Sequence, residues 1–580
     1  LTAICREIWQ RLKRTVRVPL GEAGVTLPPL SARAGKYLGF DGAGNPVPLQ
    51  PNQVNTPDLS DGAVTDPKVF DPPSPSHPDA VRASKLSFLQ AGTDAVYRTV
   101  QDKLRERVSV KDFGVTSSGD QYIRYQNACN ELSSLGGGTL VIPHDVNSVI
   151  DGILNIPDNV VLEYEGGLVG HIDPKNILNR QGKIILPSGA RITLNNGSGL
   201  RGLVIIRDGI SFTSSSAQVA AWATNGDAVV INNLTTDAFV EDCGIFGFAQ
   251  AIRSAVGATN VSRTRLRRLQ IDCVSGVLLE YAYDIPYVEE VHCWPFCSVG
   301  APGEPSGAHL LRAGTAFYFG AVNDWMKVLN CFNYGYFCGF RIKGGGNITL
   351  ISCGSDYVPD QISDGSIGFL IDGQSTETTL IACQAAARHV GFYVNTTSPH
   401  GTVSMQGCSS WECDDAHILL EKGRALIQGH RARGGNSNGV LVYAGFEKAV
   451  IVGNDFKELN VGIYQQSSTT KVYEKLNTYT NVATRKANLY KATVAVADPL
   501  PLDGESESFE ITGTGGFGNI NNPQDYTGKT LVLKFTDTVT VHSGGNMKLK
   551  DNTNFVAGAD DILVLYSDGS FFYEVSRSTN

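Results

Sequence analysis

The sequence is poor in charged residues, which make up 18% of its 580 positions, and it holds 63 glycines. This balance favours many short strands and turns over long solvated helices. No run of about 18 apolar residues occurs, so no membrane span is expected. The formal charge is -9, and the lack of a basic excess argues against a nucleic-acid-binding protein. The twelve cysteines are too sparse for a disulfide-rich secreted protein, so we expect reduced, buried thiols.

The amino-terminal segment indicates a small separate module, residues 1–50. The sequence starts at Leu1 instead of Met, which suggests that residues preceding it are absent. The first twenty residues mix Arg and Lys through an amphipathic stretch without a clean apolar core, so they are not expected to form a signal peptide. Ile4–Leu12 has helical periodicity, and the residues that follow it are of the types found in short strands and turns.

A linker and a neck are expected between this module and the rest of the chain. Residues 51–85 are rich in Pro, Asp and Ser and hold too few large apolar residues to build a core. In the segment 86–107, Val96, Val100 and Leu104 recur at four-residue steps, which predicts a helix with one narrow apolar stripe. Such a helix suits a neck that packs against partner copies.

A repeat of roughly 22 to 30 residues runs through the middle of the sequence. Its units start with Gly followed by alternating apolar residues, and one unit has His in place of Gly. The spacings between units are 25, 29, 23, 26, 22 and 23 residues. The units start at Gly314, Gly339, Gly368, Gly391, His417, Gly439 and Gly462.

Each repeat also has a second short strand that ends at a common position, most often a cysteine. These positions are Cys331, Cys353, Cys383, Cys408, His430 and Asn454, with Cys243, Cys273 and Cys293 upstream at looser spacing. Two registers with one period are typical of a solenoid in which each repeat is one coil. We interpret the cysteines as small side chains stacked inside a turn. A metal site is not expected, because zinc ligands converge on one centre and these are spread one per coil.

The predicted fold is therefore all-β: a right-handed parallel β-helix over residues 108–490 with a small amino-terminal attachment module and a carboxyl-terminal β-sandwich-like domain. Strand, helix and glycine turn at Val108–Val115, Tyr122–Leu135 and Gly136–Pro143 predict a cap that closes one end of the solenoid. Beyond residue 490 the period stops, and alternating strands separated by turns predict the sandwich over residues 491–580.

Several segments of the sequence resemble those of a known superfamily. VSVKDFGV, a following helix and GGGTLVIP resemble the opening of the pectate-lyase-like β-helix superfamily. DIPYVEEVHCWPF at Asp284–Phe296 and RAGKYLGFDGAGNPVPL at Arg33–Leu49 are similar to bacteriophage tailspikes. The similarity covers nearly the whole chain.

This resemblance implies a homotrimer on the phage tail of the virion, assembled in the host cytoplasm. The amino-terminal module would attach to a tail or baseplate protein, and the β-helix would bind and depolymerise a bacterial capsule or O-antigen polysaccharide. The carboxyl-terminal domain would serve trimerisation or carbohydrate binding. No cofactor, no nucleic acid partner and no membrane insertion are expected.

Glycosidic hydrolysis needs two carboxyl groups on one face, and the cysteine column locates a pair. Asp356 follows Cys353 by three residues, and Glu412 follows Cys408 by four. One coil, which carries Ala386, lies between them, so two steps of ~4.8 Å place their backbones about 10 Å apart. Side-chain reach can then give the roughly 6.5 to 9.5 Å expected for an inverting hydrolase. Asp356 and Glu412 are the predicted acid and base, with Asp414 as a further catalytic candidate.

Residues suited to sugar binding surround this pair. The insertion 355–366 is a loop on a rigid scaffold, where binding groups concentrate, and Trp411 stands beside three acids. Aromatic rings next to carboxylates suit the apolar faces and hydroxyls of sugars. Asp324 with Trp325 forms a second acid and aromatic pair at another turn. The predicted substrate-binding residues are Trp411, Tyr357, Asp360, Arg388, His389, Trp325 and Asp324.

Two alternatives stay open at this point. A polysaccharide lyase would need a charge neutraliser and a base, and Tyr357, Arg388 and His389 could supply them. A non-enzymatic adhesin of the same fold would bind the polymer without shortening it. A site shared between subunits is a third possibility, which does not depend on Asp356 and Glu412.

Overall fold

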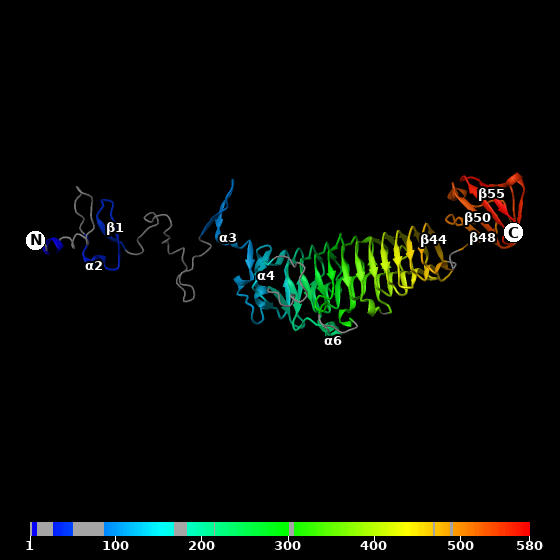
Figure 1. Cartoon of the computed structure of the whole chain (residues 1–580). Helices are drawn as coiled ribbons and strands as arrows, with labels where there is room; N and C mark the ends of the chain where they lie inside the picture. The colour runs from blue at the N-terminus through cyan, green and yellow to red at the C-terminus, as the bar shows by residue number, and fades with distance from the viewer. Residues whose placement is uncertain are drawn as a thin grey trace. The chain divides into compact units, whose positions relative to one another are not determined.

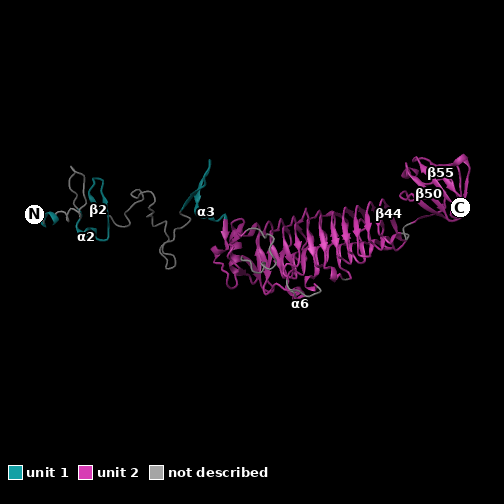
Figure 2. Cartoon of the chain, in the orientation of Figure 1, with its two compact units in different colours: residues 1–106 teal, residues 107–580 magenta. Residues whose placement is uncertain are grey.

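A computed structural model describes residues 3–7, 27–49, 86–166, 182–213, 215–300, 307–362, 364–467, 470–487 and 491–580. The predicted linker 51–85 lies outside these residues. In this part of the chain there are two compact units, Leu1–Glu106 and Arg107–Asn580 (Figure 2). No helix among the described residues is long and apolar enough to span a bilayer.

The first unit consists of small separate elements. It contains α2 (Leu30–Arg33), the hairpin of β1 (Tyr37–Phe40) and β2 (Pro46–Leu49), the hairpin of β3 (Ser87–Leu89) and β4 (Tyr97–Thr99), and α3 (Val100–Leu104). Residues 3–7 are helical, and the rest of the predicted helix Ile4–Leu12 lies outside the described residues. The neck differs from the prediction, because its helix covers only Val100–Leu104. The segment before it pairs as a strand, and the Thr99 side chain caps the helix start.

The second unit is built around three long parallel sheets, as predicted for a β-helix. Within its described residues, 14 strands form sheet A and 13 strands each form sheets B and C. Each coil passes once through A, B and C, and Figure 1 shows the coils stacked from cyan to yellow. The α4 helix (Tyr122–Ser134) buries Tyr125 and Leu132 against the first coils and forms the predicted cap.

The strands of sheet A are β5 (Arg107–Ser109), β6 (Gly138–Ile142), β9 (Val160–Tyr164), β12 (Gly199–Arg201), β16 (Phe239–Glu241), β20 (Arg265–Arg267), β23 (Tyr287–Glu289), β26 (Lys327–Leu329), β29 (Ile348–Ile351), β32 (Glu377–Ile381), β35 (Thr402–Gln406), β38 (Arg424–Gln428), β41 (Lys448–Val452) and β44 (Lys471–Lys475). The strands of sheet B are β7 (Ser148–Val149), β10 (Lys183–Leu186), β13 (Val204–Arg207), β17 (Gly244–Phe246), β21 (Gln270–Asp272), β24 (His292–Cys293), β27 (Phe332–Tyr334), β30 (Gly354–Asp356), β33 (Gln384–Ala386), β36 (Ser409–Trp411), β39 (Arg431–Arg433), β42 (Asp455–Lys457) and β45 (Thr478–Thr480). The strands of sheet C are β8 (Ile153–Ile156), β11 (Arg191–Leu194), β14 (Asp227–Ile231), β18 (Gln250–Ser254), β22 (Ser275–Leu279), β25 (Arg312–Phe319), β28 (Tyr336–Gly345), β31 (Ile367–Ser375), β34 (Val390–Thr396), β37 (Ala416–Lys422), β40 (Asn438–Val442), β43 (Val461–Gln465) and β46 (Thr484–Ala487).

The repeated glycine lies in the sheet C strands and leaves room inside the coil. At Gly368, a Cβ atom would stand 2.5 Å from the carbonyl oxygen of Gly391 and 2.9 Å from the Cβ of Ala385. An inward phenylalanine follows Gly339, Gly368 and Gly391. These three rings stack in a column with Phe317, which follows Ala316, and successive ring centroids are 4.5, 4.8 and 4.8 Å apart. The glycine pattern of the sequence therefore reflects crowding between sheets B and C.

Replacing Gly368 with Ala is expected to lower the free energy of unfolding by about 1–3 kcal/mol, because the added methyl overpacks the interior. Gly445 is the matched control, since its Cβ would be 3.4 Å from the nearest atom, the carbonyl oxygen of Glu421. Urea unfolding measures the free energy of unfolding of Gly368→Ala and Gly445→Ala. Equal midpoints for the two variants would contradict the crowding argument.

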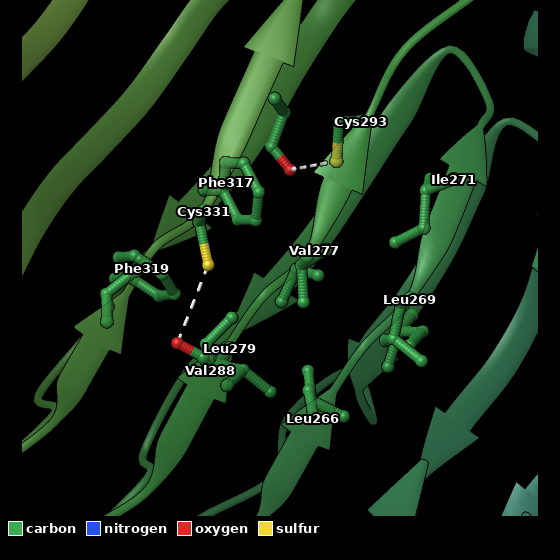
Figure 3. Packing of buried hydrophobic residues seen from close by; sticks show 14 of the residues in the cluster. Leu266, Leu269, Ile271, Val277, Leu279, Val288, Cys293, Phe317, Phe319 and Cys331 are labelled. Atoms are coloured by element: carbon green, nitrogen blue, oxygen red, sulfur yellow. Dashed lines mark hydrogen bonds between the residues drawn. The ribbon is translucent and has the colours of Figure 1, made fainter. Parts of the chain in front are cut away.

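The cysteine column occupies the turn between sheets A and B, which we call the A–B corner. Cys331, Cys353, Cys383 and Cys408 are buried there, and each thiol donates to a carbonyl of the preceding coil. Figure 3 shows Cys331 directed at the carbonyl of Val288. The residue before each column position has a left-handed φ, for example 53° at Ser352. All cysteines among the described residues are free.

Two cysteines do not belong to the column, which corrects the prediction. Cys293 lies in β24 of sheet B and Cys273 follows β21 of the same sheet. The column position in their coils is held by Val291 and Leu269, both buried. Figure 3 shows Cys293 directed at a different carbonyl, that of Ala316, 3.9 Å away. The position is therefore not specific for cysteine, because buried aliphatic side chains also fill it.

A lobe outside the coils covers part of sheet B. Its helix α6 (Ser216–Ala221) and Trp222 pack with Phe246 and Phe296 in a separate apolar cluster. Arg312 of β25 ties the lobe to sheet B through Asp272, with 2.7 Å from Arg312 Nε to Asp272 Oδ1 and both side chains fully buried.

Residues 491–580 form the predicted carboxyl-terminal domain of two sheets around a core of their own. The six-stranded mixed sheet has the order β47 (Ala492–Ala495), β48 (Ser508–Thr512), β50 (Thr530–Phe535), β54 (Ile562–Ser567), β55 (Phe572–Ser578) and β52 (Met547–Lys548). The three-stranded sheet has the order β49 (Gly515–Phe517), β51 (Val539–Val541) and β53 (Phe555–Ala557).

Candidate active site

The predicted acid and its neighbours lie where sheet B strands turn into sheet C, which we call the B–C corner. Asp356, Ala386 and Trp411 are the third residues of three successive sheet B strands, β30, β33 and β36. Ala386 pairs directly with Trp411. These third positions face outward, because the middle residues Ser355 and Ser410 are buried inside the coil. Asp356 and Trp411 therefore lie about two strand spacings, roughly 10 Å, apart on one outer face.

The Asp356 carboxyl is half-buried and its charge is only partly compensated. Burial raises the pKa of this carboxyl above its ordinary value, and the negative charge of Glu412 raises it further. The backbone N–H of Tyr357 donates to Asp356 Oδ1 at 2.7 Å, and this bond and the charge of Arg388 oppose the rise. Asp356 is therefore suited to carry a proton, which a general acid must do.

Glu412 stands at the first turn residue of the B–C corner and is exposed. Its φ is 55°, and the equivalent residues Ala387 and Glu458 have φ of 49° and 58°. The left-handed conformation is thus a property of this corner in several coils. Because Glu412 is solvated and acts electrostatically on Asp356, the two carboxyl groups have unequal environments on one corner.

Trp411 presents a partly exposed indole at the end of β36. The guanidinium of Arg433, its neighbour in register on β39, lies 5.6 Å from the ring centroid. Sequence reasoning missed Arg433. The signal was available, because Arg433 follows His430 by three residues, the offset that also gives Asp356 from Cys353.

His389 is surrounded by carboxylates at the same corner. Its Nδ1 lies 2.9 Å from Asp414 Oδ1 and 4.0 Å from Asp364 Oδ1, and its Nε2 lies 3.9 Å from Asp415 Oδ2. Asp414, predicted as a catalytic acid, is therefore engaged with His389. Asp360 is exposed in the short 3₁₀ turn of the insertion.

Arg388 and Tyr357 do not face the surface, which corrects their prediction as substrate contacts. Arg388 is 0% and Tyr357 is 2% exposed. The guanidinium of Arg388 lies 4.7 Å from the Tyr357 ring centroid and donates to Ser355 Oγ and to the carbonyl oxygen of Asp356. Burial lowers the pKa of Arg388 to about 10. Both residues hold the backbone that carries Asp356.

Asp324 and Trp325 lie at a different corner, where sheet C strands turn into sheet A, which we call the C–A corner. They stand between β25 and β26, and Asp324 forms an isolated bridge with Gly346. Trp325 is 55% exposed. Within the described residues, no group of three His, Cys, Asp or Glu is arranged to hold a metal ion.

Comparison with solved structures finds proteins of similar architecture at low identity. The tailspike of E. coli bacteriophage HK620 in complex with a pentasaccharide aligns with 85% of this chain and 96% of its own, at 13% identity and a TM-score of 0.44. Tailspike protein 3 of bacteriophage CBA120 aligns with 69% of this chain and 66% of its own, at 13% identity and a TM-score of 0.40. The A-module of Azotobacter vinelandii mannuronan C-5 epimerase AlgE6 aligns with 66% of this chain and 95% of its own, at 12% identity and a TM-score of 0.44. No family model and no curated protein matches the chain.

Proposed function

We propose that this protein is a phage tailspike that hydrolyses a bacterial surface polysaccharide at the B–C corner. The observation that carries the proposal is the pairing of Asp356, whose pKa is raised by burial and by Glu412, with a solvated Glu412 beside Trp411. Two carboxyl groups in unequal environments next to an aromatic ring fit glycosidic hydrolysis.

In the proposed reaction, protonated Asp356 donates its proton to the glycosidic oxygen as the bond to the anomeric carbon breaks. Glu412 takes a proton from a water molecule whose oxygen bonds to that carbon from the opposite face. The two-coil offset leaves room for this water, so the product has inverted configuration. Trp411 supports the apolar face of the sugar, and Arg433 holds the indole in place. His389, Asp414 and Asp360 bind sugar hydroxyls at the rim.

Elimination is less well supported by the same residues. A lyase must neutralise a uronate carboxylate, but Arg388 is fully buried and the partly exposed His389 stands among three acids. Incubating the protein with purified capsular and O-antigen polysaccharides separates the alternatives. Hydrolysis gives new reducing ends without ultraviolet absorption by an unsaturated sugar, elimination gives both, and an adhesin leaves the polymer length unchanged. Either of the latter results would overturn the proposal.

The amino-terminal residues would assemble three chains and attach them to a phage tail. The neck exposes Val96, Tyr97 and Leu104 at 74%, 75% and 62%. Isolated two-stranded hairpins are marginal in water, so these side chains favour contact with partner copies. The assignment to a virion tail rests on the resemblance of Arg33–Leu49 to tailspike sequences.

Light scattering of the full chain is expected to give a trimer, and Leu104→Asp is expected to weaken it because it places a charge in the neck contact. Asp94→Asn, an exposed change in the same segment, is the control. A monomeric parent chain would contradict the proposed assembly without touching the proposed chemistry.

A further inference from the structure

A groove of about 530 Å³ lies on the outer side of sheet C next to the C–A corner, away from the B–C corner. Its lining comes from four successive coils: Glu280 follows β22, Tyr318 is in β25, Lys343 is in β28 and Gln374 is in β31. Three strand spacings of ~4.8 Å make it about 14 Å long in the stacking direction. It is thus elongated along the β-helix and crosses several coils.

The floor of the groove has almost no side chains. Gly344, Gly345, Gly346 and Gly373 all line it. The φ values of 106° at Gly345 and 59° at Gly373 explain glycine at those two positions by the backbone alone. At Gly344 and Gly346 the φ is ordinary, but a Cβ would lie 3.3 Å from backbone atoms at Gly344 and 2.8 Å from Thr376 Oγ1 at Gly346, so packing favours glycine there. Consecutive glycines in a strand end mark a place where a ligand can approach the backbone closely.

Two charged groups of opposite sign face this floor without protein partners. Among the residues that the structure describes, no hydrogen bond or ion pair reaches the carboxylate of Glu280 or the ammonium of Lys343. The Glu280 carboxylate lies against Gly320, where a side chain would overlap it. Both groups line the groove, so an acceptor and a donor are available to a bound molecule.

Exposed apolar surface borders the groove at the C–A corner. Val322, which lines it, is 52% exposed, and Trp325 is 55% exposed. The backbone N–H of Trp325 donates to the carbonyl oxygen of Gly346 at 3.2 Å, which places this residue next to a glycine of the groove. Asp324 bridges to the same glycine. The predicted pair Asp324 and Trp325 therefore belongs beside this groove.

We infer that this groove is a second saccharide-binding site, which takes an uncharged stretch of the polymer that the B–C corner cuts. Sugars combine apolar faces with hydroxyls that both donate and accept, and this matches a glycine floor, Tyr318 and Trp325 with Glu280 and Lys343. The opposite charges balance, so the groove does not favour a polyanion. The identity of the polymer rests on the proposed function, while the presence of a site rests on the groove.

The test uses the full chain carrying Asp356→Asn, so that polymer is bound but not shortened. Capsular and O-antigen polysaccharides, immobilised by their reducing ends, are the probes, and retention is measured by surface plasmon resonance. Glu280→Gln and Lys343→Met are each expected to weaken binding about tenfold, because each removes a charge-assisted hydrogen bond. Lys422→Met is the matched control, an exposed lysine at the end of β37 outside the groove, and is expected to bind as the parent does.

Unchanged binding in both groove variants would overturn the inference. A change in sedimentation of either variant would also overturn it, because the groove would then be an interface between copies. Failure of the proposed function is distinguished by the chain with Asp356 intact. If that chain binds a polysaccharide in a Lys343-dependent manner but shortens none, the saccharide-binding groove is supported and the proposed hydrolysis is refuted.

Discussion

Replacing Asp356 with Asn is expected to slow depolymerisation about 10³-fold while leaving polymer binding within a few-fold of the parent. General acid catalysis contributes on the order of 10² to 10⁴ in rate, and an amide cannot supply the proton to the leaving oxygen. The amide keeps the shape of the carboxylate, so it can still accept the N–H of Tyr357. New reducing ends measure the rate, and retention on immobilised polymer measures binding.

Asp455→Asn is the control for this result, because Asp455 is an exposed acid on sheet B that bonds to Thr478. It is expected to retain the parental rate. A fully active Asp356→Asn chain would remove Asp356 from the mechanism and move the search to grooves between subunits.

The pH dependence of the rate is a second test of Asp356 as the general acid. Asp356 must be protonated to act, so the rate falls as pH rises through its pKa. Because burial and Glu412 raise that pKa, this limb is expected above the range of an ordinary aspartate. Glu412→Gln removes the neighbouring charge, and it is expected to move the limb to lower pH as well as to lower the rate. A limb that stays in place in Glu412→Gln would show that the two carboxyl groups do not interact.

The coils were predictable because the same crowding recurs in each of them. At Gly339, Gly368, Gly391, Gly439 and Gly462, a side chain would overlap an inward residue or a carbonyl oxygen. This recurring crowding produces the glycine repeat of the sequence. Cys273 and Cys293 were misplaced because a buried cysteine suits any inward position. Val291 and Leu269 fill the column there, and spacing alone does not distinguish thiol from aliphatic side chains.

The candidate site was predictable only in part, because side-chain direction at a corner depends on distant coils. Arg388 was expected outside, but it bonds to the carbonyl oxygens of Tyr336 and Phe337, more than fifty residues earlier. Glu280 and Lys343 belong to one groove through coils whose lengths differ. Offsets from the cysteine column placed Asp356 and Glu412 at one corner, because sheet B strands are short and keep their register.

Beneath the B–C corner, two buried histidines are expected to make the fold sensitive to acid. Ser410 Oγ lies 2.8 Å from His417 Nδ1 and 2.8 Å from His430 Nε2, and the carbonyl oxygen of Gly434 lies 3.0 Å from His417 Nε2. Both rings are 0% exposed. Burial lowers the pKa of His417 to about 4 and of His430 to about 3. Both rings are therefore neutral in the folded chain near neutral pH.

Acid is expected to destabilise the folded chain through these two histidines. An unfolded histidine has a pKa of about 6.5, so below that pH the unfolded chain binds protons that the folded chain excludes. Stability is fully present above pH 6.5 and is lost as pH falls toward the folded values. Each histidine contributes about 1.4 kcal/mol per pH unit, or roughly 4 kcal/mol for both at pH 5.

Urea unfolding at pH 7.5 and pH 5.0 measures this loss, and His430→Asn is the informative variant. Asn454 occupies the same position of the A–B corner one coil later, so an amide is tolerated there. His430→Asn is expected to halve the pH dependence, whereas His400→Asn, at an exposed position, is expected to leave it unchanged. Equal slopes in all three chains would contradict the argument. Because Ser410 directly precedes Trp411, protonation of these histidines would disturb the strand that carries Trp411 before it unfolds the whole β-helix.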